Sequence, residues 1–476
     1  MLQPVTERAG AKSDGRGSEL SVARALMPAV SRLFSTRSAV CGTSKTERVG
    51  MSADAAGTSA RATNCDHPFE HKRVYIPPMA YGSGRAFAAG FRALGVDARI
   101  TPPSDDRTRE LGARHTSGDE CYPAKITVGD FLKVLESPET DPAKIAFFMP
   151  TADGPCRFGQ YATHLRRILD ANGYSEVTVL SPTSKNSYGD LGSLARPFVR
   201  TSWRMLVCAD ILHKALLRVR PHEREQGAAD TVHERSLDDL CATAENSSVE
   251  PCAQLKALRG ALERSRERFR ALRISRDPAT LRIGVVGEIF CRLNTYSNEN
   301  LVRRIEAFGA EVWLSDITEW VWYTSVEGRR KRRLAGHSHS LAALGAWVRD
   351  HVQHRDEQAL LGVFRDEFAG CEEPGVETIL DCARPYLPPD GALGEMVLSV
   401  GKAAYLAQKG LDGIIDISPF TCMNGIVSEA IYPRVSRDHG GIPIRNFYFD
   451  GTQSDLDRDL GVYVELARSY RRRKNC

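Results

Sequence analysis

Three short loops that contain cysteine are the parts of this chain best suited to chemistry. They read HTSGDECYPAK (115–125), DGPCRFGQY (153–161) and DISPFTCMNG (416–425). In each loop a cysteine stands close to Gly or Pro, just ahead of a predicted helix. Cys156 and Cys422 also follow the apolar runs KIAFFMP and GIIDIS, which predict buried strands. Thiolates are soft metal ligands, so the repeated arrangement indicates a metal site at the carboxyl-terminal edges of two sheets.

An iron–sulfur cluster is the metal group that this arrangement favours. Such clusters are bound by thiolates, and a nearby positive charge or a helix N-terminus lowers the pKa of a thiol. Cys156 has Arg157 beside it, Cys422 begins a predicted helix, and Cys121 precedes Pro123, a residue suited to a first helical turn. Three ligands would leave one iron open to substrate or water.

The spacing of these cysteines leaves a second interpretation open. Cys121 and Cys156 are 35 positions apart, Cys156 and Cys422 are 266 apart, and the chain has no CxxC pair. The three residues are therefore also compatible with buried or loop cysteines that bind nothing. Cys291 follows a predicted strand and is an alternative ligand, although no Gly or Pro adjoins it. The remaining cysteines rank lower as ligands, either in helical or variable segments (Cys208, Cys241, Cys252, Cys371, Cys382) or near the termini (Cys41, Cys65, Cys476).

Polar residues near the cysteines suggest catalytic and binding roles. In GEIFCRLNTYSNEN (287–300), the residues Glu288, Arg292, Asn294 and Asn298 fall where a predicted strand meets a helix. We expect Glu288 to act in catalysis and Arg292 and Asn294 to hold a substrate or the cluster sulfurs. The alternative is simple helix capping in this segment.

Two further residues flank the first cysteine. His115 and Glu120 are candidates for proton relay to Cys121, while Arg157 is a candidate for binding a cofactor. The competing interpretation of His115 is an ordinary polar loop residue.

Alternating strands and helices predict the architecture that positions these loops. The pattern favours an α/β fold with two flavodoxin-like, parallel-sheet lobes, a helical connector and the site in the cleft between the lobes. The expected boundaries are a disordered tail (1–71), a first α/β domain (72–195), a helical connector (196–280) and a second α/β domain with a C-terminal helix (281–476). The segment SRLFSTRSAV (31–40) is typical of a transit peptide, but we favour a dispensable extension with Met51 as the true start.

Composition excludes several classes of protein. The chain has 476 residues, of which 42% are hydrophobic and 26% charged, as in a globular protein of more than one domain. The net charge is +4, and residues 1–65, with nine Lys/Arg and five Asp/Glu, contain the whole excess. This balance argues against nucleic-acid binding, and no apolar stretch is long enough to span a membrane. Twelve cysteines without a secretory signal favour a reducing cytoplasm.

Missing motifs narrow the function further. The chain has no GxxxxGK[ST] loop, no GxGxxG that opens a helix and no GxSxG elbow. The basic run GRRKRRLAG (328–336) is more typical of a solvated helix face than of a site for an anionic ligand.

Together, HTSGDECYPAK, DGPCRFGQY, the GE…R.N segment, SPFTCMNGIVSEA and IPIRNFYFDG resemble the 2-hydroxyacyl-CoA dehydratase superfamily, over about residues 73–470. The resemblance implies a [4Fe-4S] cluster bound by Cys121, Cys156 and Cys422, or the double-cubane cluster of a related branch. It also implies low-potential one-electron chemistry on an acyl-CoA, with an electron from a separate ATP-dependent activase. A dimer remains open. The alternatives are a non-catalytic electron carrier or activase partner, and a cluster-free α/β protein that binds a small ligand.

Overall fold

The computed structural model describes residues 70–475, apart from 153, 155, 184–187, 390–393 and 453–454. The chain divides into two units, Met1–Thr63 and Asn64–Cys476, and all described residues belong to the second. The predicted disordered tail, with its transit-like segment, lies outside them except for its last two residues.

The first sheet has four parallel strands in the order β2-β1-β3-β4. Its register aligns Val74 with Ala98 and Arg73 with Ile145. The strands are β1 (Arg73–Ile76), β2 (Ala98–Ile100), β3 (Ile145–Phe148) and β4 (Thr178–Leu180). The helices between them are α2 (Tyr81–Ala93), α3 (Asp106–Arg114), α4 (Tyr122–Leu135) and α5 (Tyr161–Ala171).

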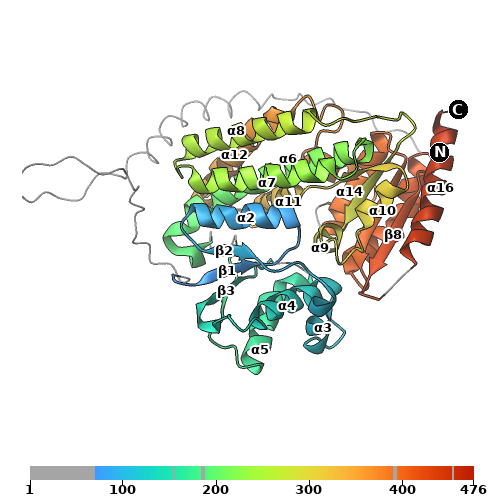
Figure 1. The fold of residues 1–476 in the computed structure, drawn as a ribbon. Helices are drawn as coiled ribbons and strands as arrows, with labels where there is room; N and C mark the ends of the chain where they lie inside the picture. The colour runs from blue at the N-terminus through green and yellow to red at the C-terminus, as the bar shows by residue number, and fades with distance from the viewer. Residues whose placement is uncertain are drawn as a thin grey trace, which may run out of the picture. The chain divides into compact units, whose positions relative to one another are not determined.

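Helices cover both faces of this sheet (Figure 1). On one face Val74 and Phe148 pack with Phe91 of α2, and on the other Phe147 stacks on Phe131 of α4 with 4.3 Å between ring centroids. All four residues of β3 are buried, as expected for a parallel strand with helices on both sides.

The second sheet repeats this strand order as β6-β5-β7-β8. Its strands are β5 (Leu281–Gly287), β6 (Ala310–Leu314), β7 (Gly413–Pro419) and β8 (Ile444–Phe449). One face packs on α10 (Leu301–Ala307) and α16 (Leu456–Asn475), and the other on α14 (Glu395–Gln408) and α15 (Met423–Asp438). The predicted α/β fold with two parallel sheets is confirmed.

Helices fill the segment between the sheets and a long insertion in the second half. The connector contains α6 (Ala195–Val219), α7 (Ala228–Asn246) and α8 (Pro251–Arg270), as expected. After β6 come α11 (Ile317–Leu334), α12 (Leu341–Leu361) and α13 (Val376–Ala383). Sequence reasoning missed α3, α13 and the five-residue α9 (Ile289–Leu293). Short 3-10 turns are Pro142–Lys144, Arg157–Gln160, Gly189–Leu194, Arg220–His222 and Gly362–Phe364.

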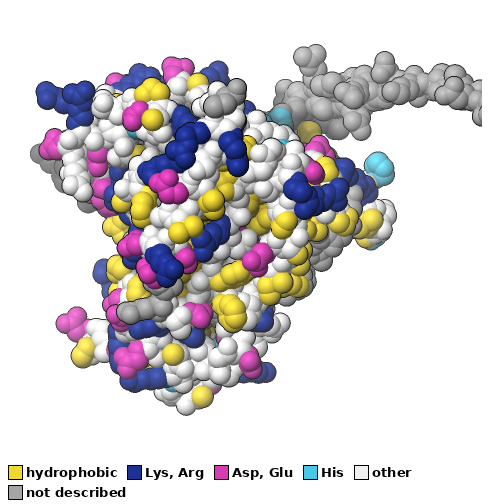
Figure 2. All heavy atoms as spheres, turned by 90° about the vertical axis from the view of Figure 1, so that its right-hand side faces the viewer, with side chains coloured by type: hydrophobic (Ala, Val, Ile, Leu, Met, Phe, Trp, Pro, Cys, Tyr) yellow, Lys and Arg dark blue, Asp and Glu magenta, His cyan; other side chains and the backbone are white. Residues whose placement is uncertain are grey.

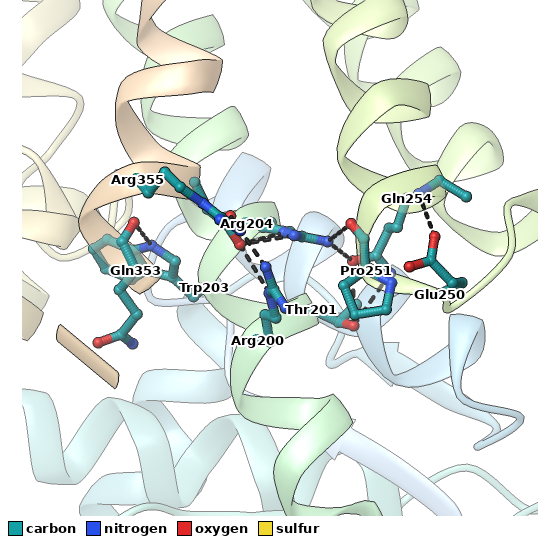
Figure 3. Close-up of polar contacts among 11 residues, drawn as sticks. Arg200, Thr201, Trp203, Arg204, Glu250, Pro251, Gln254, Gln353 and Arg355 are labelled. Atoms are coloured by element: carbon teal, nitrogen blue, oxygen red, sulfur yellow. Dashed lines mark hydrogen bonds and ion pairs between the residues drawn. The ribbon is translucent and has the colours of Figure 1, made fainter. Parts of the chain in front are cut away.

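A buried ion cluster ties α12 to the connector (Figure 3). Asp356 of α12 is fully buried and accepts hydrogen bonds from Arg204 Nε (2.8 Å) and Arg200 Nε (2.9 Å) of α6. Arg204 is also fully buried, and its Nη1 donates to the Pro251 carbonyl (2.8 Å) and to Gln254 Oε1 (2.9 Å) of α8. One guanidinium therefore links three helices.

Basic and acidic side chains are mixed on the face that Figure 2 shows. Lys and Arg occur there in several separate groups, with Asp, Glu and hydrophobic side chains between them. The basic side chains do not form one continuous field on this face. Within the described part of the chain, no helix combines the length and apolar character needed to cross a bilayer.

The first prediction concerns the buried ion cluster. We expect Asp356→Asn to lower the free energy of unfolding by about 3–5 kcal/mol, because it leaves the buried Arg204 guanidinium, together with the half-buried Arg200, without a counter-charge. Urea unfolding followed by circular dichroism measures this loss.

Arg355→Ala is the matched control, since this exposed guanidinium lies 3.7 Å from the same carboxylate. It should cost less than about 1 kcal/mol. Equal losses for the two variants would show that the cluster contributes no more than a surface pair.

Candidate functional site

The three candidate cysteines occupy the same local position. Each is the residue that precedes a helix: Cys121 precedes α4, Cys156 the 3-10 turn Arg157–Gln160 that leads into α5, and Cys422 α15. Their φ angles are −67°, −69° and −68°, with extended ψ. The prediction that each cysteine stands just ahead of a helix is confirmed.

Cys156 and Cys422 are equivalent in the two sheets. Cys156 follows β3 and Cys422 follows β7, and each of these strands is third in the order of its sheet. In both sheets this strand lies beside the strand that comes first in the sequence, β1 or β5. The chain adds its second strand on one side of that strand and its third on the other, so the direction of winding reverses between them. Ligands of open α/β sheets bind at such a switch point, outside the carboxyl ends of the strands.

Two contacts connect the loop of Cys121 to the loop of Cys156. The Cys121 Sγ lies 2.6 Å from the hydroxyl oxygen of Tyr161, the first residue of α5. Arg157 Nη1 donates to the Asp119 carbonyl at 2.7 Å. The predicted binding residue Arg157 therefore holds the two loops together and lies close enough to lower the pKa of Cys121.

The carboxyl group of Glu288 influences the thiols of all three candidate cysteines. Its negative charge contributes to raising the pKa of Cys121, Cys156 and Cys422 alike. Such an effect requires that the carboxyl group lie within electrostatic reach of all three sulfurs. The fold thus brings the predicted catalytic residue together with the predicted metal ligands, although they come from both halves of the chain.

The expectation of low thiol pKa values is wrong for this structure. Cys156 is the most exposed of the three residues. Nevertheless, loss of solvent around its sulfur raises the pKa of its thiol to about 11, with contributions from the charges of Glu395 and Glu288. Burial, with the same two carboxyl groups, raises the pKa of Cys422 to about 12. Backbone N–H groups at the helix starts act in the opposite direction but are outweighed.

Glu288 belongs to a buried carboxyl pair. Glu288 begins α9 and accepts the backbone N–H groups of Phe290 (3.0 Å) and Cys291 (2.8 Å), while Glu395 Oε1 accepts that of Ile289 (3.0 Å). Burial raises the pKa of both carboxyl groups, and the charge of Arg292 opposes this. Each carboxyl group therefore keeps its proton to a higher pH than an ordinary glutamate does.

Sequence reasoning missed Glu395, because a Glu in the first turn of a helix is also an ordinary helix-start residue. The position of Glu288, the partner of Glu395, is set by the backbone at the end of β5. Gly287 has φ +113°, and a Cβ there would lie 2.1 Å from the Ile417 carbonyl oxygen of β7. Only glycine fits this close approach of the two strands.

Asn294 has a role different from the one expected. Its Nδ2 donates to the Pro78 carbonyl (3.0 Å) and to Ser104 Oγ (3.2 Å), and its Oδ1 accepts the Ser297 N–H (2.8 Å). Its amide is thus used to join the loop after β5 to loops of the first sheet. Arg292 is buried beside it, and its Nε has no hydrogen-bond partner.

The structure separates His115 from the cysteines. His115 Nδ1 lies 3.4 Å from Asn172 at the C-terminal end of α5, whereas Tyr161 and Cys121 meet at the other end, about 16 Å away for an eleven-residue helix. Glu120 is used locally, since its Oε2 accepts the N–H groups of Ser117 (2.8 Å) and Gly118 (3.2 Å). His115 is therefore not placed as a direct relay to Cys121, while the other oxygen of Glu120 lies 3.7 Å from His164 Nε2.

Cys291 lies closer to the site than its sequence context suggested. Its side chain is fully buried in the core beside β5 and β7. Burial raises its pKa well above the usual value, with further contributions from Glu288, Cys121 and Cys422. Among the other cysteines, Cys208, Cys241 and Cys371 are buried, Cys382 is half-buried and Cys252 is exposed.

Across the described residues, no group of three or more His, Cys, Asp or Glu side chains is arranged to hold a single metal ion. Ligands of one ion each lie about 2.3 Å from it, whereas cysteines that bind a cluster are attached to different irons and stand farther apart. The donor set of thiols at helix starts is therefore compatible with a cluster. No family model matches the chain, and no curated protein matches it.

Another buried carboxyl group allows a test of the electrostatics of the second sheet. Asp416 of β7 accepts hydrogen bonds from Tyr432 OH (2.5 Å) and Ser418 Oγ (2.9 Å). Burial raises its pKa to about 6 from an ordinary value of 3.8. The folded protein therefore binds a proton here between these pH values that the unfolded chain releases.

The second prediction follows from this shift. Stability due to the protonated carboxyl is fully present below about pH 4 and is lost as pH rises through 6. We expect the stability of the wild type relative to Asp416→Asn to fall by about 2–3 kcal/mol over this range. Denaturant unfolding at several pH values measures the difference.

Asp450→Asn is the control, because the pKa of Asp450 is lowered instead by its hydrogen bonds with Thr452 and despite burial. The stability of the wild type relative to Asp450→Asn should therefore rise, not fall, as pH increases. A flat profile for Asp416→Asn would contradict the assigned shift.

Proposed function

We propose that this chain is an iron–sulfur protein of the 2-hydroxyacyl-CoA dehydratase type. Cys121, Cys156 and Cys422 would hold the cluster. The observation that carries the proposal is the convergence of these cysteines, each at a helix start and all within reach of Glu288. A bound cluster would supply low-potential one-electron transfer to an acyl-CoA or similar substrate.

The residues around the thiols suit this function in three ways. Tyr161 lies 2.6 Å from the Cys121 sulfur and is positioned to donate a hydrogen bond to it once the thiol has lost its proton. Arg157 holds the two cysteine loops of the first sheet together. Arg292 supplies a buried positive charge beside Glu288 and Glu395.

The raised thiol pKa values have a consequence for binding. Ligand cysteines must lose their protons, so the binding of a cluster to buried thiols releases protons and weakens as pH falls. Glu288 and Glu395 are carboxyl groups near the thiols that can hold a proton. Both oxygens of Glu288 accept backbone N–H groups of α9, whereas Glu395 uses only Oε1 in this way and keeps Oε2 for a proton. They are therefore the proposed proton store of the site, in place of His115 and Glu120.

The partners follow from the same proposal. The chain has no phosphate-binding GxxxxGK[ST] loop, so electrons would come from a separate ATP-dependent activase. The substrate would be an acyl-CoA, and the compartment would be a reducing cytoplasm.

The third prediction tests the cluster. Protein purified without oxygen should contain about four irons and equal sulfide per chain, or about eight for a double cubane. Cys422→Ala should lose most of this iron because one of three ligands is gone.

Cys252→Ala is the matched control, since Cys252 is exposed on α8, far along the chain from all three loops. It should keep the wild-type iron content. Iron-free wild-type protein that also fails reconstitution would contradict the proposal and favour a cluster-free ligand-binding protein. Iron-containing protein that turns over no acyl-CoA with a low-potential donor would favour an electron carrier.

A further inference from the structure

A cavity of about 40 Å³ lies at the carboxyl end of β6, on residues separate from the cysteine loops. Its wall includes Lys214 of α6, Lys402 of α14, Ser315 and Asp316 after β6, and Glu373 from the segment before α13. The rings of Trp313 and Tyr405 and the side chain of Leu406 supply apolar surface. A wall that combines charged groups with apolar surface suits a small organic ion.

Each lysine of the cavity has its own carboxylate partner on the body of the protein. Lys214 Nζ donates to Asp316 Oδ2 at 2.9 Å, and Lys402 Nζ donates to Glu319 Oε2 at 2.8 Å. The Lys402 and Glu319 side chains are each only 4% exposed. These two pairs fix the positions of both ammonium groups.

Glu373 bridges the two lysines from a different part of the chain. Its Oε2 accepts from Lys214 at 3.1 Å and its Oε1 from Lys402. Residues 371–375 form neither helix nor strand, and the Glu373 side chain is 21% exposed, more than the groups it contacts. A planar carboxylate thus occupies a seat formed by two fixed cations, but it is held there by an irregular segment.

An unsatisfied donor faces the same cavity. Ser315 is 1% exposed, its Oγ has no hydrogen-bond partner among the described residues, and it lines this cavity and a smaller neighbouring one of about 10 Å³. An unpaired buried hydroxyl destabilises a protein, so a bound molecule that accepts from Ser315 would recover free energy.

We propose that this cavity is a binding site for a small organic carboxylate, and that Glu373 occupies the carboxylate position when the ligand is absent. The ligand carboxylate would accept from Lys214 and Lys402, and its carbon chain would lie against Trp313 and Tyr405. Displacement of Glu373 would move the segment 371–375 away from the two lysines. The inference uses none of the three proposed ligand cysteines and does not rest on the proposed function.

The charges around the seat select this class of ligand over others. Asp210 and Asp316 line the cavity beside the lysines. These carboxyl groups would repel a doubly charged phosphate more strongly than a singly charged carboxylate. An ammonium ligand would lie between two ammonium groups. The Glu373 carboxylate already occupies this position, so the position accommodates a carboxylate.

The fourth prediction uses propionate as the probe, with the full chain and isothermal titration calorimetry. The wild type should bind propionate in the millimolar range. Glu373→Gln should bind it about tenfold more tightly, about 1.4 kcal/mol, because a neutral amide competes less well for two lysines. Ser315→Ala should bind about threefold to tenfold more weakly and fold normally, since its hydroxyl has no partner to lose.

Glu377→Gln is the control, just beyond the same segment. The Glu377 carboxylate pairs with Arg329 at 2.7 Å and is not part of the cavity wall, so the affinity of this variant for propionate should equal that of the wild type. Four results would overturn the proposal: no binding by wild type or Glu373→Gln, binding by Glu373→Gln alone, equal affinities for the two, or phosphate or propylammonium binding at least as tightly as propionate. The second would mean that Glu373 closes the site permanently.

Discussion

The connection rule for parallel strands is the constraint on which the rest of this structure depends. A parallel strand must be followed by a crossover, here helical, that returns to the start of the next strand. Every returning helix therefore begins at the carboxyl edge of its sheet. A residue that precedes such a helix is placed at this edge by topology alone, and the three cysteines all hold that position. Two sheets with one strand order then supply two equivalent edges.

Buried charge is the second recurring feature of the molecule. A charge removed from water is tolerated when an opposite charge or several hydrogen bonds replace the solvent, or when a proton neutralises it. In the Arg204–Asp356 cluster an opposite charge replaces the solvent. The same is true at the end of β6, where two lysines pair with three carboxylates. Glu288 and Glu395 are shifted toward neutralisation by a proton, because burial raises the pKa of both and the single charge of Arg292 only opposes this.

These two solutions suit different purposes. A fully paired cluster such as Arg204–Asp356 joins helices and has little left to offer a ligand. A carboxyl pair whose pKa values are raised, next to thiols that must lose their protons to bind a metal, forms a site whose charge state changes with whatever binds there. The lysine cluster lies between these cases, since its third carboxylate comes from an irregular segment and an adjoining hydroxyl is unpaired.

The sequence by itself determined the elements and the local setting of the cysteines. Apolar runs such as KIAFFMP and GIIDIS are strands because parallel strands are buried on both faces, and the cysteines precede helices because Gly and Pro punctuate the chain there. Only the tertiary structure decided which residues meet. Glu395 joins Glu288 across 107 positions, Asn294 links the two sheets, and His115 is drawn to the far end of α5. The thiol pKa values were likewise beyond sequence reasoning, since burial and distant carboxyl groups outweigh the helix starts that the sequence shows.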